Sequence, residues 1–371
     1  MNAWLRFCTM GNPVKPTGNE ALWKQFAIPA LAILLFLLRH YHPSGWLLLP
    51  SVIALVAAVL SAVHHAEVIA HRIGEPFGAL VLALAVTVIE VSIIISLMLA
   101  GGAQTAVLAR DTVFAAIMII MTGMTGLTLL IGGLKYREQQ FATEGINTEL
   151  TLLVAISVLT LILPNFTLAV PGPYYNPQQL IFVAIVTLIL YGSFLFVQNF
   201  RHRSHFVEAN EDSHQAVKPG KKASLFSALL LPINLIGVVL LAESLADDLE
   251  HFIEAIGAPV SLAGIIIACV ILLPEGISAI KAASKNQMQR SLNLSLGSAL
   301  ASISLTIPVV ALIAVYTGIP LALGLETESM VLFLLSLFVL ILSIGKGKTT
   351  ILQGIVLLVL FTVYLFITIV P

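Results

Sequence analysis

Two stretches of the sequence read GALVLALAVTVIEVSIIISLMLA at residues 78–100 and AGIIIACVILLPEGISAI at residues 263–280. Each is close to the ~20 apolar residues that a helix needs to cross a bilayer. Each also carries one acid inside its apolar run, Glu90 in the first and Glu275 in the second. An acid at such depth costs roughly 2.5–3.5 kcal/mol on insertion scales, so it is tolerated when it is protonated, paired with a cation or facing a wet cavity. The sequence therefore predicts a site at which protons and cations compete.

The composition of the chain is typical of a membrane protein. Of its 371 residues, 58% are hydrophobic and 10% are charged, whereas a soluble domain carries about 25% charged residues. We therefore expect an all-α polytopic membrane protein surrounded by a lipid bilayer. A formal net charge of −1 gives no reason to expect a nucleic-acid partner, and the two cysteines suggest neither a disulfide framework nor a zinc site. Residues 1–24 lack the apolar core of a signal peptide and are expected to form a cytoplasmic tail.

Polar breaks divide the apolar sequence into eleven expected spans, each about as long as a bilayer requires. They lie at residues 25–39, 46–63, 77–100, 112–134, 150–170, 179–198, 225–242, 259–281, 291–317, 329–345 and 350–370. With the N-terminus in the cytoplasm, only Arg39 and Arg110 of the 18 lysines and arginines fall on the outer side. Because cytoplasmic loops are enriched in these cations, the sequence predicts a cell (inner) membrane protein with its N-terminus inside and its C-terminus outside.

A polar segment at residues 201–224 divides the spans into two groups, and we expect it to be a cytoplasmic loop. Residues 25–200 hold one extra N-terminal helix and five further spans, and residues 225–371 hold another five. An odd number of spans per group inverts the second five relative to the first, as in transporters built from inverted repeats. Glu90 and Glu275 each lie in the second span of their five, so their carboxyl groups are expected to meet near the middle of the membrane.

Hydroxyl groups accompany both acids. Thr87 precedes Glu90 by three residues and lies on the same helical face. The helix after Glu275 carries a stripe of hydroxyls at spacings of three and four residues, in which Ser298 and Ser302 are the candidates for lining a cation path. The alternative is that such hydroxyls satisfy carbonyls of their own helices, or that small residues only allow close packing.

Pro274 and Gly276 flank Glu275 and predict a break in its helix. Proline removes one backbone hydrogen bond and frees the carbonyl four residues earlier, here that of Val270. Freed carbonyls at a broken membrane helix can bind a cation. A simple proline kink is the alternative.

A second group of ionisable residues lies at the inner end of the second span and consists of His64, His65, His71 and Glu67. Such a group can bind a metal ion in a membrane enzyme, although histidines at a membrane interface often have no ligand. An intramembrane metal-dependent enzyme is therefore one alternative function for this chain. A cation channel is another, which the lack of a continuous file of polar residues disfavours.

The sequence also resembles a known family. LLPEGISAIKAASKNQMQRSLNLSLGSALASISLTIPV, residues 272–309, is similar to the second α-repeat of the calcium/proton exchanger family, within the cation/calcium antiporter superfamily. The shared features are Glu275 ten residues before the turn that begins at Lys285, and a following helix with Gly297 and Ser298. HHAEVIAHRIGEPFGALVLALAVTVIEVSIIISLM, residues 64–98, resembles the first α-repeat. Over nearly its full length the chain looks most like the bacterial calcium/proton antiporters that also handle sodium and potassium.

The resemblance implies a secondary active antiporter that exports Ca²⁺ in exchange for protons, with no cofactor and no enzymatic activity. It assigns the cation and the protons to Glu90 and Glu275, because one Ca²⁺ or two protons neutralise two carboxylates equally well. The wider family has an asparagine before each acid, where this chain has Thr87 and Leu272. Leucine offers no oxygen, whereas Ca²⁺ takes about 6–8, so Na⁺ and K⁺ are further candidate substrates. The oligomeric state stays open.

Overall fold

The structure is a computed structural model that describes residues 19–42, 45–74, 77–101, 106–201, 219–255, 257, 259 and 261–370. The predicted tail at 1–24 and loop at 201–224 lie largely outside these residues. The α-helices are α2 (Asn19–Tyr41), α3 (Leu48–Ile73), α4 (Phe77–Gly101), α5 (Leu108–Met118), α6 (Thr125–Tyr136), α7 (Thr143–Ser157), α8 (Pro177–Phe196), α9 (Lys221–Ala255), α10 (Ser261–Ser284), α11 (Met288–Thr317), α12 (Thr327–Ile344) and α13 (Ile351–Ile369).

Shorter elements connect or extend these helices. A 3-10 turn, η1 (Gly45–Leu47), leads into α3, and a π-helix, η3 (Ile119–Met124), joins α5 to α6 without a break. A π-helix, η4 (Val158–Ile162), and then a 3-10 helix, η5 (Leu163–Phe166), extend α7. A further π-helix, η6 (Val197–Arg201), extends α8. Two strands, β1 (Gln139–Gln140) and β2 (Lys348–Thr349), form a small sheet.

The eleven predicted spans are confirmed as apolar helices. Within the described part of the chain, nine helices are long and apolar enough to cross a membrane, and shorter apolar helices lie at Phe26–Tyr41 and Ala83–Ser96. The boundary of the span predicted at 150–170 was wrong, since that helix runs from Thr143 to Phe166. It ends early because Pro164 has no N–H with which to continue the ladder and lies in a 3-10 turn instead.

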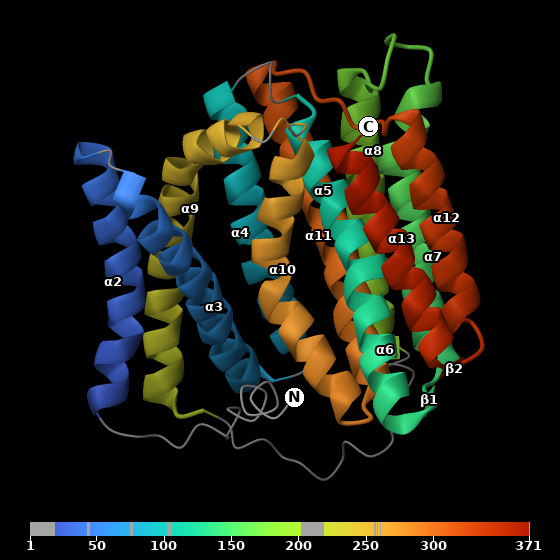
Figure 1. Ribbon diagram of the computed structural model, residues 1–371, viewed down its shortest axis with the longest axis horizontal. Helices are drawn as coiled ribbons and strands as arrows, with labels where there is room; N and C mark the ends of the chain where they lie inside the picture. Colours follow the sequence, from blue (N-terminus) through green and yellow to red (C-terminus); the bar gives the residue numbers. More distant parts are fainter. Residues whose placement is uncertain are drawn as a thin grey trace.

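The predicted helix break was also wrong. α10 is one continuous helix through Pro274 and Gly276, and it bends along its course (Figure 1). A proline removes a single hydrogen bond, and a helix that is packed against neighbours can absorb that loss by bending. Here α5 and α11 pack against α10 on the core side. The irregular backbone that packs against α10 is instead the π-helix η3, which we did not predict.

Three long helices, α2, α3 and α9, form a bundle to one side of the molecule (Figure 1). α3 packs against α9, and one of its faces buries small residues spaced four apart, Ala54, Ala58, Ala62 and Ala66, each at most 3% exposed. Small residues at this spacing let membrane helices approach closely. The bundle has a hydrophobic cluster separate from the main one, which lies among α5 to α8 and α10 to α13. The molecule therefore consists of a bundle and a larger core, with α4 between them.

The connectors of the larger core pair in an exchanged order. β1, between α6 and α7, is antiparallel to β2, between α12 and α13. Tyr174, between α7 and α8, forms a bridge with Ala322, between α11 and α12. We count five spans from α3 to α8, with α5 to α6 as one span, and five from α9 to α13. The third connector of each set then pairs with the fourth connector of the other set. This is the pairing that two inverted five-helix repeats produce.

The two ends of the molecule differ in charge. One end carries β1 and β2, and we call it the basic end because it bears Arg72, Lys135, Lys281, Lys285 and Lys348. The opposite end is called the acidic end, because it bears Asp111, Asp248, Glu326 and Glu328.

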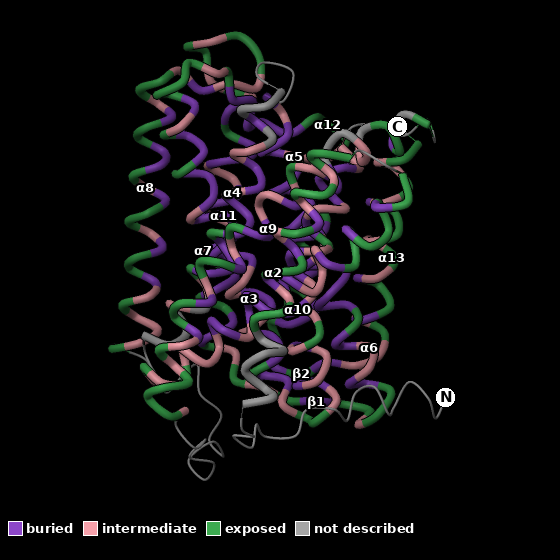
Figure 2. The backbone as a smooth tube through the Cα atoms, turned by 90° about the vertical axis from the view of Figure 1, so that its left-hand side faces the viewer, coloured by how far each residue is buried: buried purple, intermediate pink, exposed green. Residues whose placement is uncertain are grey.

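Apolar side chains cover the outer surface between the two ends. Exposed positions alternate with buried ones along α8 and α13 at the edges of the molecule (Figure 2). On α8 the exposed positions include Phe182, Ile185 and Ile189. Lipid tails are the natural cover for such a surface, so the chain is a multi-pass membrane protein.

Candidate cation site

Glu90 lies in the middle of α4 and is 3% exposed. The Oγ of Ser302 lies 2.7 and 2.8 Å from its two carboxyl oxygens and donates its hydrogen to them. Ser302 belongs to α11, which packs against α4. A hydroxyl of the second half of the chain therefore satisfies the acid of the first half.

Glu275 on α10 has a different environment. It is partly exposed, yet its Oε2 is buried and receives no hydrogen bond from the described residues. Its helix α10 packs against α4, which carries Glu90, and against α3, which carries Glu67. The two predicted acids thus lie on neighbouring helices in unequal surroundings, since Glu90 has a hydroxyl partner and the buried Oε2 of Glu275 has none among the described residues.

The other predicted residues are placed around this pair. Thr87 is buried one turn before Glu90. Ser298 lies one turn before Ser302, is partly exposed, and makes no hydrogen bond with either carboxyl group in the described structure. Thr306, one turn beyond Ser302, is fully buried, and its hydroxyl also faces the Glu90 carboxyl group. Of the hydroxyl stripe, Ser302 therefore donates a hydrogen bond to an acid, and Thr306 places a second hydroxyl beside the same acid.

The start of the same stripe has a structural role. Ser291 donates its hydroxyl hydrogen to the carbonyl of Ala279 at 2.9 Å, and Ser295 donates to the carbonyl of Ser291 at 3.0 Å. These contacts attach the start of α11 to α10 and satisfy its own backbone. In this part of the stripe the hydroxyls therefore satisfy helix carbonyls, which was the alternative to a cation path.

On the opposite side of the site, the helix formed by α5, η3 and α6 contributes threonines without free hydroxyls. Thr125 donates to the carbonyl of Ile120 and Thr128 to that of Thr125, at 2.8 and 2.9 Å. The π-helix η3 lies immediately before Thr125, and π-segments are frequent at functional sites. The sulfur of Met124 lies 3.4 Å from the position that a Cβ on Gly276 would take. Glycine thus lets η3 approach α10 one residue after Glu275.

The histidines near the basic end do not gather around one point. His65 is buried, and its Nδ1 lies 3.1 Å from the Oγ of Ser227 on α9, whereas His71 is exposed. Within the described part of the chain, no group of three or more histidine, cysteine, aspartate or glutamate residues is placed to hold a metal ion. Glu67, which the sequence grouped with these histidines, lies on α3, and α3 also packs against α10, the helix that carries Glu275. Sequence spacing could not show this, because the two residues lie on helices far apart in the chain.

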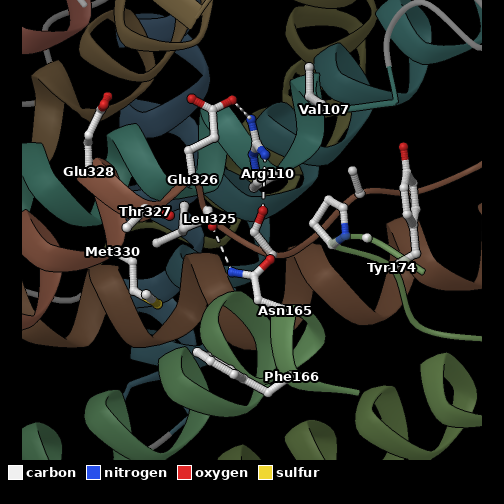
Figure 3. Close-up of a pocket in the computed structure, with 14 residues that line it drawn as sticks. Val107, Arg110, Asn165, Phe166, Tyr174, Leu325, Glu326, Thr327, Glu328 and Met330 are labelled. Atoms are coloured by element: carbon white, nitrogen blue, oxygen red, sulfur yellow. Dashed lines mark hydrogen bonds and ion pairs between the residues drawn. The ribbon is translucent and has the colours of Figure 1, made fainter. Parts of the chain in front are cut away.

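A cavity of about 720 Å³ lies at the acidic end, and neither Glu90 nor Glu275 lines it (Figure 3). Arg110 at its wall is 5% exposed and donates hydrogen bonds to Asp111 at 2.7 Å and to the carbonyl of Gly324 at 3.0 Å. Asn165 donates to the carbonyl of Leu325 at 2.7 Å. These contacts fix the connector between α11 and α12 against the first half of the chain.

A match to a family model adds to this geometry. The model of the sodium/calcium exchanger protein family matches residues 43–200 and 226–370, which include both carboxylate helices. The chain belongs to this family. Proteins of this exchanger family are transporters, so the chain is a cation antiporter, and the enzyme interpretation of the histidines is wrong.

Individual members of the exchanger family cover most of the chain. A putative ionic transporter of Sinorhizobium fredii is 47% identical over 338 residues, which are 90% of this chain and 92% of the relative. The sodium-potassium/proton antiporter ChaA of Escherichia coli is 39% identical over 320 residues, which are 85% of this chain and 86% of the relative.

Two solved structures share the fold. The Ca²⁺/H⁺ antiporter YfkE matches 94% of this chain and 99% of its own, with a TM-score of 0.68 and 19% identity. The H⁺/Ca²⁺ exchanger CAX matches 94% of this chain and 89% of its own, with a TM-score of 0.68 and 18% identity. At 19% and 18% identity, these structural matches establish only that the chain shares the arrangement of the helices.

Proposed function

We propose that this exchanger exports Ca²⁺, with Na⁺ or K⁺ as further substrates, in exchange for protons, and that Glu90 and Glu275 bind both. The observation that carries the proposal is that each half of the chain places one acid on a helix of the same three-helix contact: α4 and α10 pack against each other and against α11, Glu90 is buried, and the Oε2 of Glu275 is buried without a partner among the described residues. Relatives support the choice of ions: one is a sodium-potassium/proton antiporter, and two proteins with the same fold are Ca²⁺/H⁺ exchangers.

Electrostatics makes such a pair an exchanger. Two ionised carboxylates away from water are strongly unfavourable, and one Ca²⁺ or two protons remove the charge. The protein therefore switches the side of the membrane to which the site is open when a cation or protons are bound, and seldom when the site is empty. Thr87, Ser302 and Thr306 supply neutral oxygens, and water would complete the shell that Ca²⁺ requires.

In this conformation, ions are proposed to reach the two acids from the basic end of the molecule. Glu275 and Glu67 are both partly exposed, whereas Glu90 is closed off. Lysine and arginine accumulate on the cytoplasmic side of membrane proteins, so the basic end is assigned to the cytoplasm, with the N-terminus inside and the C-terminus outside. Rocking of the α2, α3 and α9 bundle against the larger core would then open the opposite side.

The proposal is tested with the purified protein in liposomes that contain a pH dye. A proton gradient is imposed, and Ca²⁺, Na⁺, K⁺ and Mg²⁺ are added in turn. We expect proton flux upon addition of Ca²⁺, with the panel ranking the other cations, and none in protein-free liposomes. Absence of flux with every cation, from protein shown to be inserted, would refute the proposal.

Replacing Glu67 with glutamine is expected to raise the KM for Ca²⁺ added at the basic end roughly three- to tenfold and leave the maximal rate near that of the wild type. The reason is that Glu67 adds a negative charge near Glu275 but is partly exposed and is not one of the two acids proposed to bind the cation. Initial rates against Ca²⁺ concentration measure this. Glu144→Gln removes an exposed carboxylate from α7 and is the matched control. Equal KM values in both variants would contradict the role of Glu67.

Replacing Ser302 with alanine is expected to slow exchange about tenfold, since a hydrogen bond to a charged group contributes roughly 1.5–3 kcal/mol. Ser302→Thr keeps the hydroxyl and should retain most of the rate. Ser295→Ala, which removes a hydroxyl bonded to its own helix, is the control. The measurement is the same dye assay at saturating Ca²⁺. Similar rates in Ser302→Ala and Ser295→Ala would show that the contact with Glu90 is dispensable.

A further inference from the structure

A third membrane-embedded acid lies away from the cation site. Glu149 is on α7, six residues from the start of the helix at the basic end, and is 0% exposed. Neither of its carboxyl oxygens has a hydrogen-bond partner in the described structure. The same face of α7 buries Ile146, Leu150 and Leu153. The carboxyl group therefore lies among apolar side chains.

Charged neighbours do not compensate for this burial. The helices packed against α7 are α8, α11 and α12. The ionisable residues of these helices, of the π-helix η6 and of α7 itself include Glu144, Tyr191, Arg201, Arg290 and Glu328. None of them donates a hydrogen bond to the Glu149 carboxyl group, because both of its oxygens are without a partner in the described structure.

A carboxyl group in this environment is stable only in its neutral form. Burial of an unpaired ionised carboxylate is so unfavourable that the group takes up a proton or a cation instead. A cation would need several oxygens around it, and the carboxyl group has no oxygen-bearing partner here. We propose that Glu149 is a second proton-binding site, separate from the Glu90–Glu275 pair, which holds its proton at neutral pH.

The position of this proton connects it to transport. α7 packs chiefly against α11, the helix that carries Ser302 to Glu90. Ionisation of Glu149 would draw water between α7 and α11 from the basic end, because the charge requires solvation. Loosening of α11 would disturb the contact between Ser302 and Glu90. Alkaline pH at the basic end therefore slows exchange by removing the proton from Glu149.

Infrared spectroscopy tests the protonation without relying on transport. The full-length protein is labelled with ¹³C-glutamate, carries Glu90→Gln and Glu275→Gln to remove the other buried acids, and is placed in lipid nanodiscs at neutral pH. We expect an isotope-shifted band of a protonated carboxyl group. It should persist when exposed Glu144 is replaced by glutamine and disappear in Glu149→Gln. A spectrum that Glu149→Gln leaves unchanged would overturn the proposal. If Glu149→Gln fails to assemble, Glu149→Met, which needs no hydrogen-bond partner, gives the same comparison.

The transport arm uses the native pair of acids. Wild-type liposomes are compared with Glu149→Gln at neutral and at alkaline pH on the basic side, with the other side held constant. Both rates respond to the altered proton gradient, so the quantity compared is the ratio of the wild-type rate to the Glu149→Gln rate. We expect this ratio to fall about tenfold from neutral to alkaline pH, the effect of roughly 1.4 kcal/mol. An equal fall in both proteins would overturn the link to transport.

Discussion

Glutamine in place of Glu275 is expected to abolish exchange while the protein still inserts and folds. Glutamine has nearly the same shape, but it cannot release a proton and offers no negative charge to a cation. The buried pair would then carry a charge of −1 at most, which Ca²⁺ cannot neutralise without leaving a net charge of its own. The measurement is Ca²⁺-dependent proton flux in the dye-loaded liposomes, with size-exclusion chromatography to confirm folding.

Glu90→Gln should give the same loss, because the proposed exchange needs both carboxylates. Glu144→Gln, with an exposed carboxylate on α7, is the control and should transport like the wild type. Robust exchange by either Glu275→Gln or Glu90→Gln would rule out a scheme in which both carboxylates are needed.

Replacing Gly354 with valine is expected to prevent stable assembly of the protein. A Cβ at this position would lie 2.6 Å from the backbone nitrogen of Leu130 and 2.8 Å from the carbonyl oxygen of Gly126. α13 and α6 cross there with their backbones in contact, so the clash cannot be relieved by a side-chain rotation. Overpacking in a rigid core costs about 1–3 kcal/mol and occasionally more, and backbone contact puts this site at the upper end.

The measurement is the yield of monodisperse protein in detergent and its thermal unfolding. Gly192→Ala on α8 is the matched control, because no atom lies within 4 Å of the Cβ it would add. A Gly354→Val protein that is as monodisperse and heat-resistant as Gly192→Ala would show that α6 and α13 can separate without harm.

Hydropathy was sufficient to predict the fold class and the eleven spans, because the bilayer fixes both the length and the polarity of each helix. The two acids stood out for the same physical reason, since a carboxyl group inside an apolar run is energetically unusual. The spacing of the hydroxyl stripe suggested Ser298 and Ser302, of which Ser302 donates a hydrogen bond to Glu90 and Ser298 does not. These predictions succeeded because each depended on residues close together in the sequence.

The remaining features depend on contacts between distant segments. Glu67 belongs with Glu275 because α3 lies near α10, which no spacing reveals. Glu149 was overlooked because the predicted span began at residue 150, which placed this acid just outside the membrane, whereas the helix begins at Thr143. The bend at Pro274 was taken as a break because sequence alone does not show which neighbours support a helix.

The exchanged pairing of the connectors also bears on how the chain is built. Each half of the larger core supplies one strand or bridge at the basic end and one at the acidic end, and receives its partner from the other half. A half synthesised alone would expose these unpaired edges together with the glycine surface of α6 or α13. Neither half is therefore expected to fold by itself. Two polypeptides cut between the halves should be unstable separately and recover a working protein only when they are made together.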